Sequence, residues 1–277
     1  MAIQTKISMN ITPHIRKVDG YNILYLAQGD PSNNDVMILL HGIGASSDRW
    51  LKVIPILSKH FYVIAPDIIG FGYSEKPEAS YTIDFFVDFI MKFIESMNLK
   101  GKKITLLGSS LGGHIAAEFA IKYPDVLSNL ILVSPAGIVK HGTKALNDYI
   151  LAAMYPTLDN AIEAFKEMAT DPDAIDMNYI KNFVNRMKLP NAKYAFLAAL
   201  MGSKRAPNLK DRLDKIKVRT LIIWGEKDKL LPVEYADEFK KMRNAKIIIM
   251  KCVGHVPFEE KPEEFCKFVI EFIKDND

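Results

Sequence analysis

A serine flanked by glycines is the strongest chemical signal in this chain. Ser110 lies in the pentapeptide Gly-Ser-Ser-Leu-Gly, between Gly108 and Gly112, with an apolar run before it and a helical pattern after it. Glycines allow a strand-to-helix turn that is too sharp for side chains, and this turn exposes a serine hydroxyl at the start of a helix. We therefore predict that Ser110 is a nucleophile. Ser109 is the competing hydroxyl, and an ordinary packed turn would also use small residues.

A serine hydroxyl is a poor nucleophile at neutral pH, so it needs a histidine base and a carboxylate that orients the histidine. In enzymes that use this kind of turn, the acid and then the histidine follow the serine along the chain, each after a strand. Asp228 follows the apolar run 218–224, and His255 follows the run 246–250. The order and placement predict a catalytic triad of Ser110, Asp228 and His255.

Each partner has an alternative in the sequence. Glu226 is also a carboxylate just after the strand, but it falls inside the turn with Gly225, where a solvated side chain is expected. His114 lies one helical turn beyond the serine, and a lone histidine on a helix is usually a packed or solvated side chain. Asp228 and His255 remain the favoured pair.

A second motif, His-Gly-Ile-Gly, follows the apolar run 36–40 and begins at His41. The tetrahedral intermediate of acyl transfer needs two hydrogen-bond donors for its oxyanion, and one usually comes from the residue after the nucleophile, here Leu111. The backbone N–H of Ile43 is predicted to be the second donor. For His41 itself we favour a structural role, in which hydrogen bonds brace the loop, over proton transfer.

Composition excludes some functions. The 277 residues include 36 Lys and Arg against 33 Asp and Glu, a formal net charge of +3, and 49% are hydrophobic. A large apolar core is therefore expected, whereas the balanced charge without a Lys/Arg cluster argues against nucleic acid or an anionic membrane as a partner.

The cysteines and the termini also limit the class of protein. Cys252, in an expected strand, and Cys266, in an expected helix, are too few for a disulfide framework and are expected to be small buried residues. No metal-spaced Cys/His cluster or phosphate-binding glycine loop is present, so the sequence predicts neither a metal nor a cofactor. The N-terminus lacks a signal-peptide core, and no stretch approaches the ~18 apolar residues of a membrane span. We expect a cytoplasmic protein.

The segments that must position these residues alternate between expected β-strands and expected α-helices. Continuous apolar runs, which are typical of a parallel sheet covered on both faces, alternate with segments of helical period. The expected strands are 36–40, 61–65, 103–107, 129–133, 218–224 and 246–250, and the expected helices are 83–97, 111–123, 233–242 and 262–274. Two segments before residue 34 are predicted to form an antiparallel edge hairpin around Asp19 and Gly20.

One interval interrupts this alternation. The stretch from Ser134 to Val218 spans about 80 residues with helical pattern and no strand, far more than one crossover needs. We predict an inserted helical cap at 135–208, on a core formed by 1–134 and 209–277. Its expected helices are 144–155, 158–169, 177–187 and 191–201. Aromatic and Met side chains of this insertion are expected to roof an apolar pocket above the nucleophile.

Four motifs occur in a characteristic order: Leu-His-Gly-x-Gly at 40–44, Asp-x-x-Gly-x-Gly at 67–72, Gly-x-Ser-x-Gly-Gly at 108–113 and Gly-His-Val-Pro at 254–257. With them, nearly the whole chain resembles the capped, esterase-like branch of the α/β-hydrolase superfamily. The resemblance implies an α/β-hydrolase fold, a doubly wound, mostly parallel sheet with an inserted helical cap. It also implies a carboxylesterase-like serine hydrolase for small to medium acyl chains, with Asp67 in a structural role.

Two other functions remain open. Hydrolases that cleave carbon–carbon bonds in aromatic ring-fission products share the triad, and they carry a cap arginine that binds the substrate carboxylate. Arg186 occupies a comparable place, but Ser109, Val256 and the loop after His41 depart from that group's pattern. Other relatives are small-molecule receptors with a slow hydrolase site. The expected partner is a small-molecule ester or dienoate. The sequence does not determine the oligomeric state, and a dimer is one option.

Overall fold

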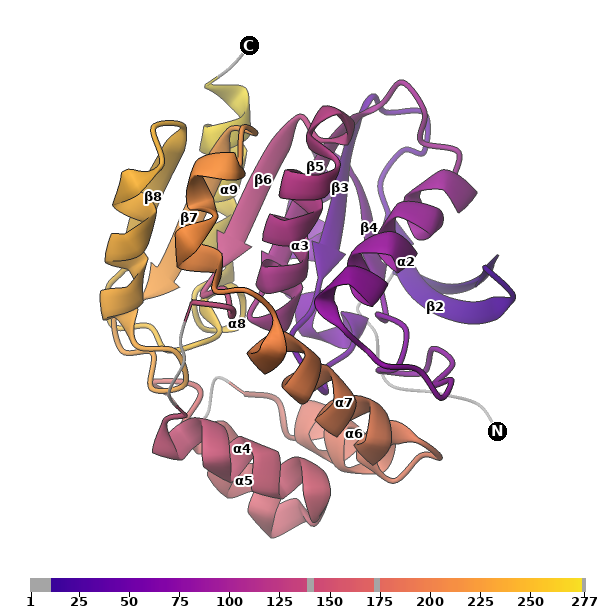
Figure 1. Ribbon diagram of the computed structural model, residues 1–277, viewed down its shortest axis with the longest axis vertical. Coiled ribbons are helices and arrows are strands. Elements are labelled where there is room, and N and C mark those ends of the chain that lie inside the picture. Colours follow the sequence, from indigo (N-terminus) through magenta and orange to yellow (C-terminus); the bar gives the residue numbers. More distant parts are fainter. Residues whose placement is uncertain (1–10, 139–141, 172–174, 276–277) are drawn as a thin grey trace.

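The computed structural model describes residues 11–138, 142–171 and 175–275. Within them, eight strands form one sheet in the order β1-β2-β4-β3-β5-β6-β7-β8, and every neighbouring pair from β4 to β8 is parallel (Figure 1). The strands are β1 Thr12–Val18, β2 Tyr21–Gln28, β3 Asp35–Leu40, β4 Tyr62–Pro66, β5 Lys103–Ser109, β6 Asn129–Val133, β7 Thr220–Gly225 and β8 Ala245–Met250. The predicted α/β-hydrolase fold class is confirmed.

The antiparallel edge of the sheet is the hairpin that the sequence predicted. β1 pairs with β2, and the two residues between them, Asp19 and Gly20, both have positive φ angles, of 51° and 89°. Positive φ at both central residues suits a tight hairpin turn, whose twist matches that of the flanking strands. β2 then pairs antiparallel with β4 and joins the hairpin to the parallel strands.

Helices cover both faces of the sheet, which explains the continuous apolar strands. Figure 1 shows α2 and α3 in front of the sheet and α9 behind it. The core helices are α1 Ile54–Leu57, α2 Ile83–Ser96, α3 Leu111–Lys122, α8 Pro257–Glu260 and α9 Pro262–Lys274, and the short 3-10 helices are η1 Ser47–Trp50, η2 Pro124–Val126, η4 Leu209–Asp211, η5 Leu213–Lys215 and η6 Val233–Lys241. No helix in the described ranges combines the length and the hydropathy that crossing a bilayer requires.

Two local expectations were wrong. The segment expected as an α-helix at 233–242 is the 3-10 helix η6, whose end closes with a hydrogen bond from the N–H of Met242 to the carbonyl of Phe239 three residues earlier (3.0 Å). Cys252 is exposed rather than buried, because β8 ends at Met250 and the chain turns there with a φ of 54° at the cysteine. Cys266 is buried, as expected.

Four helices occupy the interval between β6 and β7: α4 Lys144–Met154, α5 Leu158–Lys166, α6 Met177–Met187 and α7 Ala192–Arg205. We call them the helical cap, and Figure 1 shows them grouped at the end of the sheet toward which β6 and β7 point. The helices α4, α5 and α6 begin after Thr143, Thr157 and Asp176 respectively. The side chain of each of these residues accepts a backbone N–H bond from the first turn of its helix. The expected segment 135–208 includes 139–141 and 172–174, which lie outside the described residues.

The cap is fixed to the core by close backbone contact and by hydrogen bonds. Gly202, inside α7, packs against the segment before α2, and a Cβ atom at this glycine would lie 2.3 Å from the carbonyl oxygen of Tyr81. The hydroxyl of Tyr194 donates to the carbonyl of Ala79 (3.0 Å), and the hydroxyl of Tyr149 donates to the carbonyl of Ile43 (2.8 Å). The helix α7 therefore sits against the core without room for an added methyl group.

Because of this close contact, the substitution Gly202→Ala tests whether α7 of the cap packs directly against the core. In an unhindered helix, alanine stabilises by about 1 kcal/mol relative to glycine. Here the added methyl group meets backbone, and overpacking of this kind costs roughly 1 to 3 kcal/mol. We expect the variant to have a lower free energy of unfolding than the wild type in urea denaturation. A more stable variant would show that α7 does not contact the core as described.

Candidate active site

Ser110 occupies the sharp turn between β5 and α3 that its glycine neighbours predicted. Its backbone has φ 54° and ψ −117°, a region that residues other than glycine rarely adopt. Gly108 and Gly112 make the turn feasible, since a Cβ atom on Gly108 would lie 2.1 Å from the carbonyl oxygen of Gly112. Such strain persists only where the surrounding structure enforces it, and it is concentrated at functional sites.

The turn brings Ser110 against the loop that follows β3. A Cβ atom built on Gly42 would lie 3.2 Å from the Cβ atom of Ser110 and 3.7 Å from its Oγ atom. Ser109, the competing hydroxyl, is the last residue of β5 and is held in the sheet opposite Val133. Ser110 is therefore the serine at the elbow, in contact with the loop expected to supply an oxyanion donor.

His255 and Asp228 form a buried pair. The Nδ1 atom of His255 lies 2.7 Å from Oδ2 of Asp228, and the other carboxylate oxygen accepts the backbone N–H bonds of Leu230 and Leu231, each at 2.9 Å. A carboxylate fixed in this way orients the imidazole and keeps the proton on Nδ1, which leaves Nε2 able to accept a proton. This is the arrangement of an acid and a base in nucleophilic catalysis.

Glu226, the alternative acid, has a different environment. Its carboxylate pairs with Lys251 (2.7 Å) and accepts the backbone N–H of Cys252 (3.2 Å). The hydrogen bond from Lys251 has the largest effect on the pKa of Glu226. Together with the bond from Cys252, it holds this pKa below its ordinary value. The structure therefore brings Asp228, and not Glu226, to the histidine.

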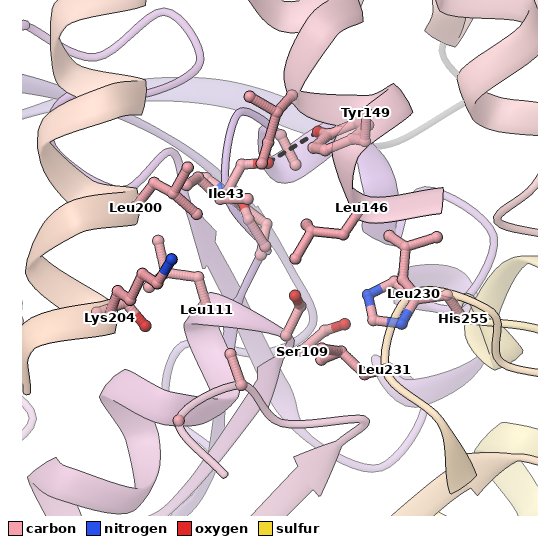
Figure 2. A pocket seen from close by; sticks show the side chains of 18 of the residues that line it. Ile43, Ser109, Leu111, Leu146, Tyr149, Leu200, Lys204, Leu230, Leu231 and His255 are labelled. Atoms are coloured by element: carbon pink, nitrogen blue, oxygen red, sulfur yellow. Dashed lines mark hydrogen bonds between the residues drawn. The ribbon is translucent and has the colours of Figure 1, made fainter. Parts of the chain in front are cut away.

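Ser110 and His255 line the same cavity, of about 640 Å³, between the sheet and the helical cap. In Figure 2, His255 lies beside Leu230 and Leu231 on one side of this cavity, and Leu111 and Leu200 lie on the other. Apolar side chains form much of its wall, namely Ile43, Leu111, Leu146, Ile150, Met168, Leu200, Leu230 and Leu231. Two of the predicted triad residues, Ser110 and His255, thus line one cavity, and Asp228 lies directly behind the histidine.

Ile43 and Leu111, the predicted oxyanion donors, also line the cavity. Leu111 is the first residue of α3, so its N–H has no carbonyl within the helix to bond with. Tyr149 of the cap holds the loop of Ile43 in place through the hydrogen bond drawn in Figure 2. Both donors are backbone groups beside the elbow, where a developing oxyanion would need them.

His41 and Asp67 brace this region, in agreement with their predicted structural roles. The Nε2 atom of His41 accepts the N–H of Ile68 (2.9 Å), and its Nδ1 atom bonds to the carbonyl of Gly42 (2.8 Å). Burial lowers the pKa of His41 below its ordinary value, which favours the neutral ring that these two bonds require. The buried carboxylate of Asp67 accepts N–H bonds from Ser47 (2.6 Å) and Tyr73 (2.7 Å).

Sequence reasoning missed the charged residues of the cavity wall, Arg49 in η1 and Lys204 and Arg205 at the end of α7. The guanidinium of Arg49 pairs with Glu259 (2.9 Å) and lies 4.3 Å from the ring centre of Tyr179 of the cap. Burial raises the pKa of Glu259 to about 7. No motif contains Arg49 or Glu259, and the pair joins opposite ends of the chain, so no local pattern could have revealed it.

Arg186 lies elsewhere. It is 1% exposed, its Nη1 atom pairs with Asp48 (2.6 Å), and it is absent from the lining of the cavity. Its predicted role in binding a substrate carboxylate therefore stays a prediction, and the structure gives the guanidinium a protein carboxylate as its partner.

Among the described residues, no three His, Cys, Asp or Glu side chains are placed to hold a metal ion.

His114 is a third histidine near the elbow, but it is fully buried and does not line the cavity. Its Nδ1 atom lies 3.0 Å from Oγ of Ser203, and Gly137 packs so closely that a Cβ atom there would lie 2.6 Å from the ring. Burial lowers the pKa of His114 to about 4. The side chain is therefore a neutral packing residue.

Known proteins resemble this chain over nearly its whole length. A family model described as the alpha/beta hydrolase fold matches residues 35–262. Human monoacylglycerol lipase ABHD6 is 29% identical, over 92% of this chain and 80% of the relative. A membrane phospholipase A, described as a bacterial virulence factor, superposes with a TM-score of 0.85 at 26% identity, covering 96% of this chain and 86% of that chain. The CarC serine hydrolase involved in carbazole degradation gives a TM-score of 0.83 at 27% identity, covering 96% and 99%.

The contrast between the two carboxylates is testable. Asp228→Asn keeps the shape of the side chain but removes the charge that fixes the histidine tautomer, and we expect turnover of p-nitrophenyl butyrate to fall roughly 10⁴-fold. Glu226→Gln is the matched control and is expected to retain near-normal turnover. Equal losses in the two variants, or an undiminished Asp228→Asn protein, would contradict the assignment of the acid.

The burial of His114 predicts a pH dependence of stability. The pKa of His114 is about 4 in the folded protein and 6.5 in its ordinary state, so between these values the unfolded chain binds more protons than the folded chain. The free energy of unfolding therefore decreases as the pH falls below about 6.5. Between pH 7.5 and pH 5 the wild type is expected to lose about 2 kcal/mol more unfolding free energy than His114→Gln. Urea titrations at both pH values measure the difference, and parallel losses in the two proteins would contradict the neutral state of His114.

Proposed function

Because this chain belongs to the α/β-hydrolase fold family, a family of hydrolases, we propose that it is a serine hydrolase that cleaves carboxylic esters of small to medium acyl chain. The observation that carries the proposal is the buried His255–Asp228 pair, which shares one cavity with a serine in a strained elbow. A nucleophile, a base and an orienting acid in this order suffice for acyl transfer through a covalent intermediate.

In the proposed mechanism, Nε2 of His255 takes the proton of Ser110 as the serine oxygen attacks the acyl carbonyl. The backbone N–H groups of Ile43 and Leu111 stabilise the oxyanion, and the charge of Asp228 stabilises the imidazolium that forms. The histidine then gives its proton to the leaving alcohol. A water molecule repeats the sequence on the acyl-serine and releases the carboxylic acid.

The apolar wall of the cavity supports an ester rather than a small polar substrate. Leu146 and Ile150 of α4 and Leu200 of α7 come from the cap, and Leu230 and Leu231 come from the loop after β7. Such a wall stabilises an alkyl chain by about 0.8 kcal/mol for each methylene group it removes from water. Two of the relatives are named as a monoacylglycerol lipase and a phospholipase A, which agrees with an acyl ester as the substrate.

Carbon–carbon bond hydrolysis of ring-fission products is the second candidate, and the likeness to the serine hydrolase of carbazole degradation favours it. Its substrates carry a carboxylate for which the predicted partner was Arg186. That guanidinium is paired with Asp48 and does not reach the cavity wall. The cavity wall is largely apolar, and the sequence departs from the pattern of the carbon–carbon bond hydrolases at Ser109 and Val256, so we place ester hydrolysis first.

A substrate panel tests the proposal. The wild type is expected to cleave p-nitrophenyl acetate, butyrate and hexanoate, with kcat/KM rising up to about fourfold per methylene group until the cavity is full. Ser110→Ala should lower these rates by at least about 10³-fold without unfolding the protein, whereas Ser109→Ala is the control and should cost far less.

The same panel includes a ring-fission dienoate. If the dienoate is cleaved and the esters are not, carbon–carbon hydrolysis replaces ester hydrolysis as the function. If Ser110→Ala keeps near-normal turnover while Ser109→Ala loses it, the nucleophile has been assigned to the wrong serine.

A further inference from the structure

The charged side chains that line the cavity are cationic, whereas the carboxylates of Asp228 and Glu259 lie behind its wall. Arg49, Lys204 and Arg205 line it, and none of the described residues in its lining is Asp or Glu. Arg49 is paired with Glu259 behind it (2.9 Å). The uncompensated positive charge of the cavity therefore resides on the other two residues.

Lys204 and Arg205 are exposed and have no ion-pair partner in the part of the chain that the structure describes. They form the end of α7, a helix whose remaining charged residue is Lys193 and which contains no acidic residue. Elsewhere on the cap, Lys144 pairs with Asp148 at 2.6 Å and Lys166 pairs with Glu163 at 2.7 Å. The cluster at the end of α7 is thus a positive patch left open at the cavity.

Lys204 lies on the wall of the cavity that Ser110 and His255 also line. Figure 2 shows the amino group of Lys204 beside Leu200 and Leu111, across the cavity from His255, and Leu111 is a proposed oxyanion donor. The neutral hydrogen-bonding side chains of Ser203 and Asn208 line the same region. Leucine side chains therefore lie on both sides of the cavity, and the side opposite the base also carries the cationic group of Lys204.

We propose that Lys204 and Arg205 bind an anionic group, a carboxylate or a phosphate, on the part of the substrate remote from the scissile ester. The inference rests on the proposed ester hydrolysis and narrows its substrates to esters that carry a negative charge. Ammonium and guanidinium groups make charge-assisted hydrogen bonds to such anions, and the planar guanidinium can bind two of their oxygens at once. The lining contains no carboxylate that would compete with the substrate for these two cations.

Cations in the last turn of a helix also stabilise the helix dipole, and this role alone would explain their position. The two roles differ in what they change. A dipole role alters the stability of α7 and affects every substrate alike, whereas an anion subsite alters the preference for charged over neutral esters. The preference is therefore the quantity to measure.

The experiment compares two substrates of similar length, mono-p-nitrophenyl glutarate and p-nitrophenyl hexanoate. The readout is the ratio of kcat/KM for the charged ester to kcat/KM for the neutral ester. In Lys204→Gln/Arg205→Gln this ratio is expected to fall at least roughly tenfold, through KM, and the loss should shrink at high salt. Lys204→Arg should retain the ratio, and Lys193→Gln, on the same helix but outside the cavity lining, is the matched control.

A 4-phosphonobutyrate p-nitrophenyl ester distinguishes the two sources of charge, because a phosphate subsite would favour it over the glutarate ester. An unchanged ratio in the double variant, with hexanoate still cleaved by the wild type, would overturn the anion subsite and leave ester hydrolysis standing. A wild type that cleaves none of these esters would overturn the proposed function and the subsite with it.

Discussion

The backbone of Ser110 has a conformation that costs free energy, and the site depends on the packing that holds it there. Its φ of 54° occurs where the start of α3 packs against both β5 and β3: a Cβ atom on Gly108 would lie 2.1 Å from the carbonyl oxygen of Gly112, and one on Gly112 would lie 2.3 Å from that of Leu40. Because the core is close-packed at this crossing, the turn has no room to relax. The same turn directs the serine to the cavity and leaves the first N–H groups of α3 without intrahelical partners.

Around this turn, the buried polar groups that define the site are satisfied by the protein before any substrate arrives. Asp228 accepts two backbone N–H bonds in addition to its contact with His255, and His41 and Asp67 join the loop after β3 to the loop after β4. Preorganised groups of this kind need no rearrangement when charge develops in the transition state. The cap closes the arrangement through Tyr149, which links α4 to the loop of Ile43.

The parts of this site that the sequence could predict share one property: each is encoded by a few neighbouring residues. Ser110, Asp228 and His255 each follow a recognisable strand, and parallel strands deliver their carboxyl ends to one edge of the sheet. The pairs Arg49–Glu259 and Arg186–Asp48 were not predictable, because they form only when distant segments fold together. The exposure of Cys252 was not predictable from the apolar pattern, because it depends on the turn after Met250, where the cysteine has a φ of 54°.

The central claim is that acyl transfer passes through a covalent bond to Ser110, and labelling the chain with a p-nitrophenyl alkylphosphonate tests it most directly. The reagent reacts with the serine that an adjacent base activates and leaves a stable adduct. Peptide mass spectrometry of the inactivated protein is predicted to find one phosphonyl group, on Ser110. An adduct on Ser109, or complete inactivation with Ser110 unmodified, would contradict the account.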